Sequence, residues 1–170
     1  MPVKDKNIYI VGFMGTGKTV VAKEVARQSG RQFIDLDSLI EKEEKKKISQ
    51  IFAQEGEAHF RMLEKEALHK AAALNKAVIA CGGGIVLDKE NIRIIKESGL
   101  MVCLTAKAGV IISRTSGKSH RPLLNVDNPA QKINDLLAER APFYAQADFH
   151  IDTSDLTIKE VVEKVLEYAG

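Results

Sequence analysis

Tryptophan is absent from this chain of 170 residues, and aromatic residues as a whole make up only 5% of it. Proteins that bind single-stranded nucleic acids stack bases on aromatic side chains, so this scarcity argues against such a site. Basic and acidic residues are nearly balanced, 25 against 23, and the net charge of +2 indicates no broad basic surface. We therefore expect neither a nucleic acid nor a membrane as a partner.

Cysteines and long apolar runs are also scarce. Cys81 and Cys103 both fall in short apolar runs typical of strands, and we expect buried free thiols rather than a disulfide or a metal site. No apolar stretch is long enough to span a bilayer, and residues 1–6 lead into the first expected strand without a signal peptide. These features favour a soluble, cytoplasmic protein, and the lack of an obvious interface stripe favours a monomer.

What the chain does contain is a phosphate-binding motif. Residues 12–19 have the sequence GFMGTGKT, which fits the pattern G-x-x-x-x-G-K-[ST]. An apolar run over residues 8–11 precedes the motif, and a helix-forming run over residues 20–27 follows it. The bare pattern would also fit an ordinary glycine-rich turn, but the strand and helix on either side favour a loop that binds a nucleotide.

The residues of this loop match the chemistry of a bound nucleoside triphosphate. Lys18 is expected to contact the β- and γ-phosphates of the nucleotide, and the Thr19 hydroxyl is expected to bind Mg²⁺. Successive backbone N–H groups of the loop would surround the phosphate oxygens, helped by the positive end of the following helix. The other nucleotide-binding residues predicted in the loop are Gly12, Gly15, Thr16 and Gly17.

Five apolar runs alternate with helical patterns along the chain. The runs typical of strands cover residues 8–11, 32–37, 77–81, 100–104 and 149–151. Strands separated by helices indicate a parallel sheet that is covered on both faces. The sequence therefore predicts a single α/β domain over residues 1–170, a three-layer α/β/α sandwich around a central five-stranded parallel sheet.

Three helix boundaries can also be predicted. Ser38 and Glu41 have the spacing of a capping box and are expected to start the second helix. The long helical pattern over residues 48–75 is expected to break near Gly56. A helix that begins at Pro129 is expected to end near Ala141.

Acidic residues and glycines follow two of the expected strands. Asp35 and Asp37 end the second strand, and three consecutive glycines follow the third, where parallel sheets collect their ligands. Asp37 could act as a base toward a substrate hydroxyl, and Asp35, on the same face of the strand, could bind Mg²⁺ through water. The two aspartates could equally cap a helix, and the glycines could form only a tight turn. Spacing alone leaves these alternatives open.

Arginines supply a possible binding site for anions. Arg61 and Arg140 lie on separate helical patterns and could hold one carboxylate together, although a lone arginine more often forms a surface salt bridge. Residues 115–122 form a polar stretch containing glycine and proline, which is typical of an active-site lid. Arg121 in this stretch could reach the β- and γ-phosphates.

These motifs resemble those of the shikimate kinase family, in order and over nearly the whole chain. The matching segments are GFMGTGKT at 12–19, DLD at 35–37, GE at 56–57, FR at 60–61 with Glu64, GGG at 82–84, RPLL at 121–124, and Arg140 with FY at 143–144. The first segment is shared with many NTPases. The combination of residues 60–61, 82–84 and 121–124 is much more specific.

The resemblance implies a P-loop NTPase kinase fold of the nucleoside monophosphate kinase type. In this fold, a substrate-binding helical region would cover about residues 38–64, and a mobile lid would cover about residues 114–128. The implied reaction is transfer of the γ-phosphoryl group of ATP, with Mg²⁺, to the 3-hydroxyl of shikimate. This reaction is a step toward chorismate and the aromatic amino acids.

The resemblance also assigns roles to the residues that would bind shikimate. Asp37 would bind the ring hydroxyls and act as the base, and Arg61 and Arg140 would hold the carboxylate. Glu64 would orient Arg61. The residues packed against the substrate would be Gly82, Gly83 and Gly84.

Further residues would bind the nucleotide and the metal. Lys18 and Arg121 would stabilise the phosphate charge, and Asp35 would belong to the magnesium shell. Arg114 would flank the adenine, and Thr153 would lie on the far side of the adenine pocket. Two other functions remain open at this point: a kinase for another small metabolite, such as gluconate or a nucleoside monophosphate, and a non-catalytic nucleotide-binding relative.

Overall fold

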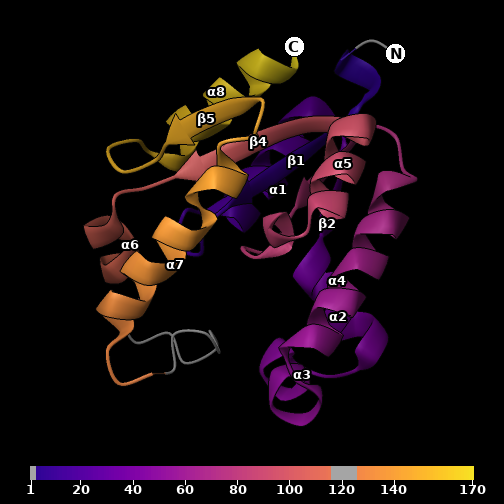
Figure 1. Ribbon diagram of the computed structural model, residues 1–170. Coiled ribbons are helices and arrows are strands. Elements are labelled where there is room, and N and C mark those ends of the chain that lie inside the picture. The colour runs from indigo at the N-terminus through magenta and orange to yellow at the C-terminus, as the bar shows by residue number, and fades with distance from the viewer. Residues whose placement is uncertain (1–2, 116–125) are drawn as a thin grey trace.

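Strands that are buried on both faces form the centre of the fold (Figure 1). The computed structural model describes residues 3–115 and 126–170. The described elements, in chain order, are the 3-10 helix η1 (Val3–Asp5), β1 (Asn7–Gly12), α1 (Lys18–Ser29), β2 (Gln32–Asp35), α2 (Leu36–Glu44), α3 (Ile48–Glu55), α4 (Glu57–Ala72), β3 (Ala77–Ala80), the 3-10 helix η2 (Ile85–Leu87), α5 (Lys89–Ser98), β4 (Gly99–Thr105), α6 (Ala108–Thr115), α7 (Pro129–Tyr144), β5 (Phe149–Asp152) and α8 (Ile158–Ala169).

The five strands form one parallel sheet with the order β2-β3-β1-β4-β5. Strand β1 lies in the middle, where Ile8 is opposite Val78 on one side and Leu100 on the other. The chain runs from β1 to β2 at one edge, returns with β3 between these two strands, and then continues on the other side of β1 with β4 and β5. The predicted five-stranded parallel sheet is confirmed, and the change of direction beside β1 is where such sheets open a crevice for ligands.

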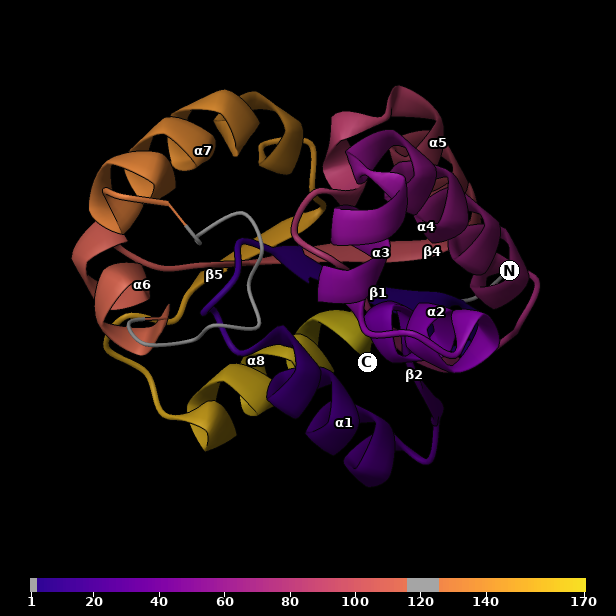
Figure 2. The ribbon, with the colours of Figure 1, turned by 90° about the horizontal axis from the view of Figure 1, so that it is seen from below.

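Alternate residues of the strands pack into two separate hydrophobic cores. Tyr9 and Val11 belong to the core between the sheet and α4, α5 and α7, whereas Ile8 and Ile10 face α1 and α8. This period of two is what a strand buried on both faces produces. Viewed along the perpendicular direction, the sheet lies between these two groups of helices (Figure 2). The predicted three-layer sandwich is therefore confirmed.

The second strand is shorter than predicted. Strand β2 ends at Asp35 and α2 begins at Leu36, so Asp37 lies in the first turn of a helix and does not share a strand face with Asp35. The Asp35 Oδ1 atom accepts a hydrogen bond from the Ser38 N–H at 3.1 Å and caps α2. The predicted capping box of Ser38 and Glu41 is wrong, because an aspartate that caps equally well comes three residues earlier.

The other two predicted helix boundaries had different outcomes. The break near Gly56 is confirmed, since this residue separates α3 from α4. Helix α7 continues past Ala141 to Tyr144, with Pro142 inside it. Proline has no backbone N–H, so one helical hydrogen bond is missing at position 142. The helical hydrogen bonds resume after it, because the Ala145 N–H donates to the Ala141 carbonyl at 3.0 Å.

Both cysteines are buried and free, as predicted. Of the predicted lid, residues 116–125, which include Arg121, lie outside the described residues. Within the described part of the chain, no helix has both the length and the apolar character that a membrane crossing requires. The start of the described chain at η1 and the end of α8 lie at the end of the molecule away from α3 (Figure 1).

Candidate active site

A cavity of about 1060 Å³ opens at the carboxyl ends of the central strands. Among the predicted site residues that the structure describes, all except Gly12 line this cavity. They are Gly15, Thr16, Gly17, Lys18, Thr19, Asp35, Asp37, Arg61, Gly82, Gly83, Gly84, Arg114, Arg140 and Thr153. Residues from most of the length of the chain therefore meet in one cavity, as expected if strand ends collect ligands.

The phosphate loop connects β1 to α1 and begins the wall of the cavity. The buried Thr16 hydroxyl donates to the Phe13 carbonyl at 2.7 Å, and the Lys18 Nζ donates to the same carbonyl at 3.0 Å. Gly17, with φ 86°, precedes α1, and among the described residues no side chain caps this helix. The first turn of α1 lines the cavity, so the positive end of the helix faces the place where an anion would bind, as in phosphate-binding loops.

The two predicted magnesium ligands contact each other. The Thr19 hydroxyl donates to Asp35 Oδ2 at 3.1 Å, while Asp35 Oδ1 is held by its cap interaction with Ser38. A hydroxyl and a carboxylate are hard oxygen donors that suit Mg²⁺, which usually keeps several waters and binds phosphate oxygens. In the described chain, no three His, Cys, Asp or Glu side chains gather to hold a metal by themselves. The pair therefore fits a nucleotide-bound Mg²⁺.

Arg114 and Thr153 meet beside the phosphate loop, although 38 other residues separate them in the sequence. The Arg114 Nη1 atom donates to the Gly15 carbonyl at 3.0 Å and to the Thr153 hydroxyl at 3.1 Å, and its Nη2 atom donates to the Thr153 carbonyl at 3.2 Å. The Thr153 hydroxyl in turn donates to the Thr105 carbonyl at 2.9 Å. These bonds fix the end of α6 against the loop on the predicted nucleotide side of the cavity.

Asp37 is a half-buried carboxylate on the opposite side. Its Oδ1 atom is fully buried and has no hydrogen-bond partner within the described chain. Burial raises the pKa of Asp37 to about 6, and the charge of Asp35 adds to this effect. A carboxylate with a pKa near neutrality is well suited to accept a proton from a substrate hydroxyl.

Arg61 lies on α4 between two carboxylates. Its Nη1 atom is 3.0 Å from Glu64 Oε1, and its Nη2 atom is 3.2 Å from Glu57 Oε1. The guanidinium also lies 5.3 Å from the ring centroid of Phe60. The predicted orientation of Arg61 by Glu64 thus has a geometric counterpart, because Glu64 is 1% exposed and fixed in position.

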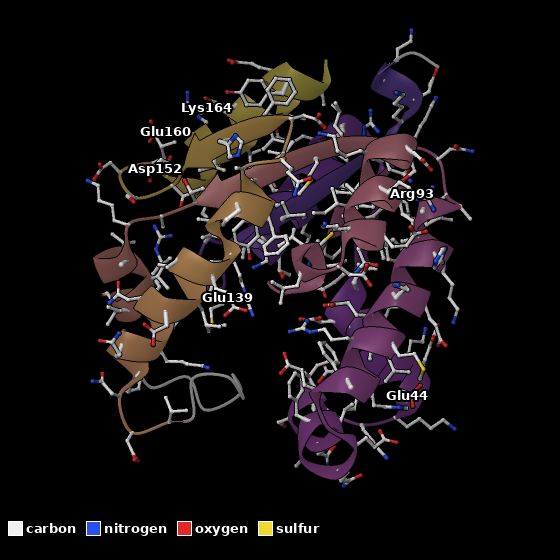
Figure 3. The ribbon with its side chains drawn as sticks, viewed as in Figure 1. Glu44, Arg93, Glu139, Asp152, Glu160 and Lys164 are labelled. Carbon is white, nitrogen blue, oxygen red and sulfur yellow. The ribbon has the colours of Figure 1, made fainter. Side chains whose placement is uncertain are left out.

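Arg140 is the second arginine of the cavity and is only 2% exposed. Its guanidinium lies 5.4 Å from the ring centroid of Phe13, and its Nε and Nη1 atoms have no hydrogen-bond partner among residues 3–115 and 126–170. By contrast, Arg93 projects from the surface (Figure 3) and pairs with two glutamates there. Unsatisfied buried donors are costly, so those of Arg140 are suited to a ligand that supplies acceptors.

The glycines at 82–84 lie among four charged side chains, those of Asp37, Arg61, Glu64 and Arg140. A Cβ atom on Gly82 would be 2.8 Å from Glu64 Oε2 and 3.1 Å from Asp37 Oδ1. A Cβ atom on Gly83 would be 3.2 Å from Arg140 Nη1, and one on Gly84 would collide with the Arg61 guanidinium. The glycines therefore leave room for charged groups, which a turn alone would not require.

Sequence reasoning gave no separate role to Tyr144. Its hydroxyl donates to the Gly83 carbonyl, so α7 supports the glycine segment directly. The available signal was the spacing: Tyr144 follows Arg140 by four residues and shares its face of α7. That signal depended on the helix continuing past Pro142, which the sequence did not predict.

The chain matches known proteins along nearly its whole length. The shikimate kinase family model matches residues 14–169. A shikimate kinase from Thermoanaerobacter pseudethanolicus is 49% identical over 162 residues, which cover 95% of this chain and 95% of that protein. One from Thermodesulfovibrio yellowstonii is 46% identical and covers 95% and 94%. The structure of a shikimate kinase from Acinetobacter baumannii in complex with shikimate has a TM-score of 0.93 and 37% identity, over 96% of this chain and 92% of that chain.

Proposed function

The chain belongs to the shikimate kinase family, and we propose that it transfers the γ-phosphoryl group of ATP to the 3-hydroxyl of shikimate, forming shikimate 3-phosphate and ADP. This reaction leads toward chorismate and the aromatic amino acids. The protein acts as a single domain, with the shikimate-binding helices at about residues 38–64 and a lid at about residues 114–128. It works as a cytoplasmic monomer.

One observation supports this proposal above the others: a carboxylate and two arginines surround three glycines. Shikimate is a small, rigid anion with three ring hydroxyls, so it needs an acceptor for hydroxyls, cations for its carboxylate, and a wall without side chains. Asp37, Arg61 and Arg140 supply the first two, and residues 82–84 supply the third. Arg140 supports the carboxylate role most strongly, because its buried Nε and Nη1 atoms lack partners among the described residues.

The reaction is an in-line transfer between two oxygens. Asp37 accepts the proton of the 3-hydroxyl while that oxygen forms its bond to the γ-phosphorus, and the bond from this phosphorus to the bridging oxygen of ADP breaks. Lys18 and the N–H groups at the start of α1 neutralise the charge on the phosphates. Arg121, which lies outside the described residues, is assigned as a further cation for the phosphates.

Nucleotide and metal bind at the other end of the cavity. Gly12, Gly15, Thr16 and Gly17 form the phosphate loop, and Arg114 and Thr153 flank the adenine. Thr19 and Asp35, whose side chains contact each other, would hold Mg²⁺. The ion supplies charge neutralisation on the β- and γ-phosphates.

The test is release of ADP by the purified protein with Mg-ATP, in the presence of shikimate, gluconate or nucleoside monophosphates. We expect shikimate alone to stimulate ADP release strongly above the rate with ATP only. Stimulation by gluconate instead would show that gluconate is the acceptor, and the protein would still be a kinase. Binding of ATP without stimulation by any acceptor would overturn the proposal in favour of a non-catalytic nucleotide-binding protein.

A further inference from the structure

Glu64 is a deeply buried carboxylate whose two oxygens have different surroundings. It is 1% exposed, and its Oε1 atom is 3.0 Å from Arg61 Nη1. Its Oε2 atom is also buried, but no donor in the described part of the chain reaches it. This second oxygen points toward Gly82, where a Cβ atom would be only 2.8 Å away. Half of the carboxylate thus faces the position expected for the substrate without a hydrogen bond.

A second unsatisfied acceptor faces the same place. Asp37 Oδ1 would lie 3.1 Å from the same Cβ position on Gly82, and it too lacks a donor among the described residues. Two buried acceptors that converge with no hydrogen between them repel each other. A proton on one of them removes this repulsion and creates a donor.

The charges around Glu64 decide how readily it takes that proton. Burial raises the pKa of Glu64 to about 7 with help from the carboxylate of Asp37, and against the opposing effect of the guanidinium groups of Arg61 and Arg140. The titratable and charged groups that face Glu64 from the surrounding elements are Asp37 of α2, Arg61 of α4, Cys81 after β3, and Arg140 and Tyr144 of α7. In the free protein, these opposing effects leave Glu64 near the midpoint of its titration at neutral pH.

An anionic substrate changes this balance in one direction. A carboxylate that binds Arg61 and Arg140 competes with Glu64 for the Arg61 guanidinium and places another negative charge beside Glu64. The substrate also excludes water from the cavity, which makes an unpaired charge still more costly. Both effects favour the neutral form of Glu64.

On the basis of the proposed function, we propose that Glu64 takes up a proton from solvent when shikimate binds. The carboxylate becomes a carboxyl group, its new O–H donates to an acceptor near Gly82, and the proton returns to solvent when the product leaves. Protonation releases Arg61 from its buried ion pair, so the guanidinium can turn its charge to the substrate carboxylate. Glu64 is therefore a positioning residue whose charge adapts to the ligand.

This proposal predicts that the affinity for shikimate depends on pH. Proton uptake and ligand binding are linked, so each increases the other by the same factor. Above neutral pH, the Kd for shikimate should rise, approaching about tenfold per pH unit, because the proton must be supplied from a more alkaline solution. Below about pH 6, Glu64 already holds its proton and the Kd should be nearly independent of this group.

The direct test is calorimetric titration of the protein with shikimate at pH 7.5, without ATP, in buffers that differ in ionisation enthalpy. The slope of the observed heat against that enthalpy gives the number of protons taken up. We expect about half a proton or more for the wild type. The Glu64→Gln variant, which keeps the shape but cannot titrate, should take up almost none. A matched control is Glu57→Gln, which removes the other, exposed carboxylate on Arg61 and should leave the proton count unchanged.

The possible outcomes separate this proposal from the proposed function. Binding of shikimate without proton uptake by the wild type would overturn the role of Glu64 and leave the kinase function intact. Undiminished proton uptake by Glu64→Gln would assign the proton to another group, and this result would also overturn the role of Glu64. Absence of any shikimate binding would overturn the proposed function itself. If Glu64→Gln does not fold, the wild-type Kd between pH 6 and 9 decides, because a flat profile contradicts the proposal.

Discussion

Two arginines show how differently one residue type is used in this molecule. Arg93 is 53% exposed and pairs with Glu90 and Glu97 on the surface of α5, where such pairs contribute about 0.2–1 kcal/mol to stability. Arg140 is 2% exposed, and two of its guanidinium nitrogens lack partners within the described residues. Folding alone gains little from burying a charge in this way. The position of Arg140 is therefore consistent with the carboxylate-binding role proposed for it.

Asp37 illustrates the same conflict between stability and function. Its pKa of about 6 lies above the ordinary value of 3.8, so the folded protein binds this proton more tightly than the unfolded chain does. The unfolding free energy should accordingly decrease as the pH rises from about 4 to about 6, and the loss is complete above that range. An uncharged residue of the same shape at position 37 would avoid this loss of stability.

We predict that Asp37→Asn raises the melting temperature of the ligand-free, metal-free protein at pH 8 by about 2–6 °C. The same change should lower kcat by a factor of about 100 or more, because it removes the base. Thermal unfolding at pH 4 and pH 8, together with ADP release, tests both effects. Wild-type turnover in the variant would show that Asp37 is not the base.

The residues of the site could be predicted from sequence only where they are close together along the chain. The phosphate loop is a continuous motif between a strand and a helix, so its residues could be assigned directly. The assignments of Arg61 and Arg140 needed the family resemblance, because helical pattern alone does not show which helix faces will meet. The convergence of Glu64 with Asp37 over Gly82 could not be predicted, since it depends on how α2 and α4 pack against the end of β3.

At the scale of elements, the sharp change of direction between α3 and α4 depends on one residue. Gly56 has φ 86° and ψ 170°, a conformation that is essentially restricted to glycine. A Cβ atom there would have no heavy atom within 4 Å, so a substitution would strain the backbone without a steric clash. The position of α3 at the cavity wall therefore depends on backbone conformation at this residue.

We predict that Gly56→Ala destabilises the protein by about 1–3 kcal/mol, which lowers the melting temperature by roughly 3–9 °C. The matched control is Gly109→Ala in α6, where a Cβ atom also has open space but the backbone is helical. Alanine should stabilise that helix by about 0.5–1 kcal/mol. Equal melting temperatures for the two variants would contradict the assignment of strain to Gly56.

The elements themselves could largely be predicted from periodicity, and the errors occurred at their ends. The strands have buried residues on both faces, so their apolar runs were clear. The end of β2 was misplaced because a capping aspartate and a strand-ending aspartate leave the same sequence signal. The extension of α7 was missed because Pro142 usually ends a helix, and the packing that keeps the last turn in place is tertiary.

At the scale of the whole molecule, the cavity has two ends that belong to different parts of the fold. The phosphate loop, Arg114 and Thr153 lie at one end, and Asp37, Arg61 and the glycines at 82–84 lie at the other. Each ligand should therefore stabilise the folded protein when it is present alone. A ligand at 100 times its Kd adds about 2.7 kcal/mol, or roughly 5–10 °C for a chain of this size.

We predict that Arg61→Ala loses at least half of the stabilisation by shikimate and keeps the stabilisation by Mg-ATP. The substitution removes a charged contact to one ligand only, which should weaken shikimate binding by about 10–100-fold. Melting temperatures with each ligand, referred to the ligand-free variant, test this, and Arg93→Ala serves as a surface control. Equal loss of both shifts would indicate that Arg61 is structural.

Helix η1 and the end of α8 lie on the side of the molecule away from α3 (Figure 1), whereas the cavity opens at the carboxyl ends of the strands. A solid support or a carrier protein attached near η1 or at the end of α8 would therefore lie behind the opening of the cavity. Small molecules could still diffuse in and out of the immobilised protein without obstruction. Because both attachment points lie on the same side, the protein could be tethered at either of them with the cavity still open.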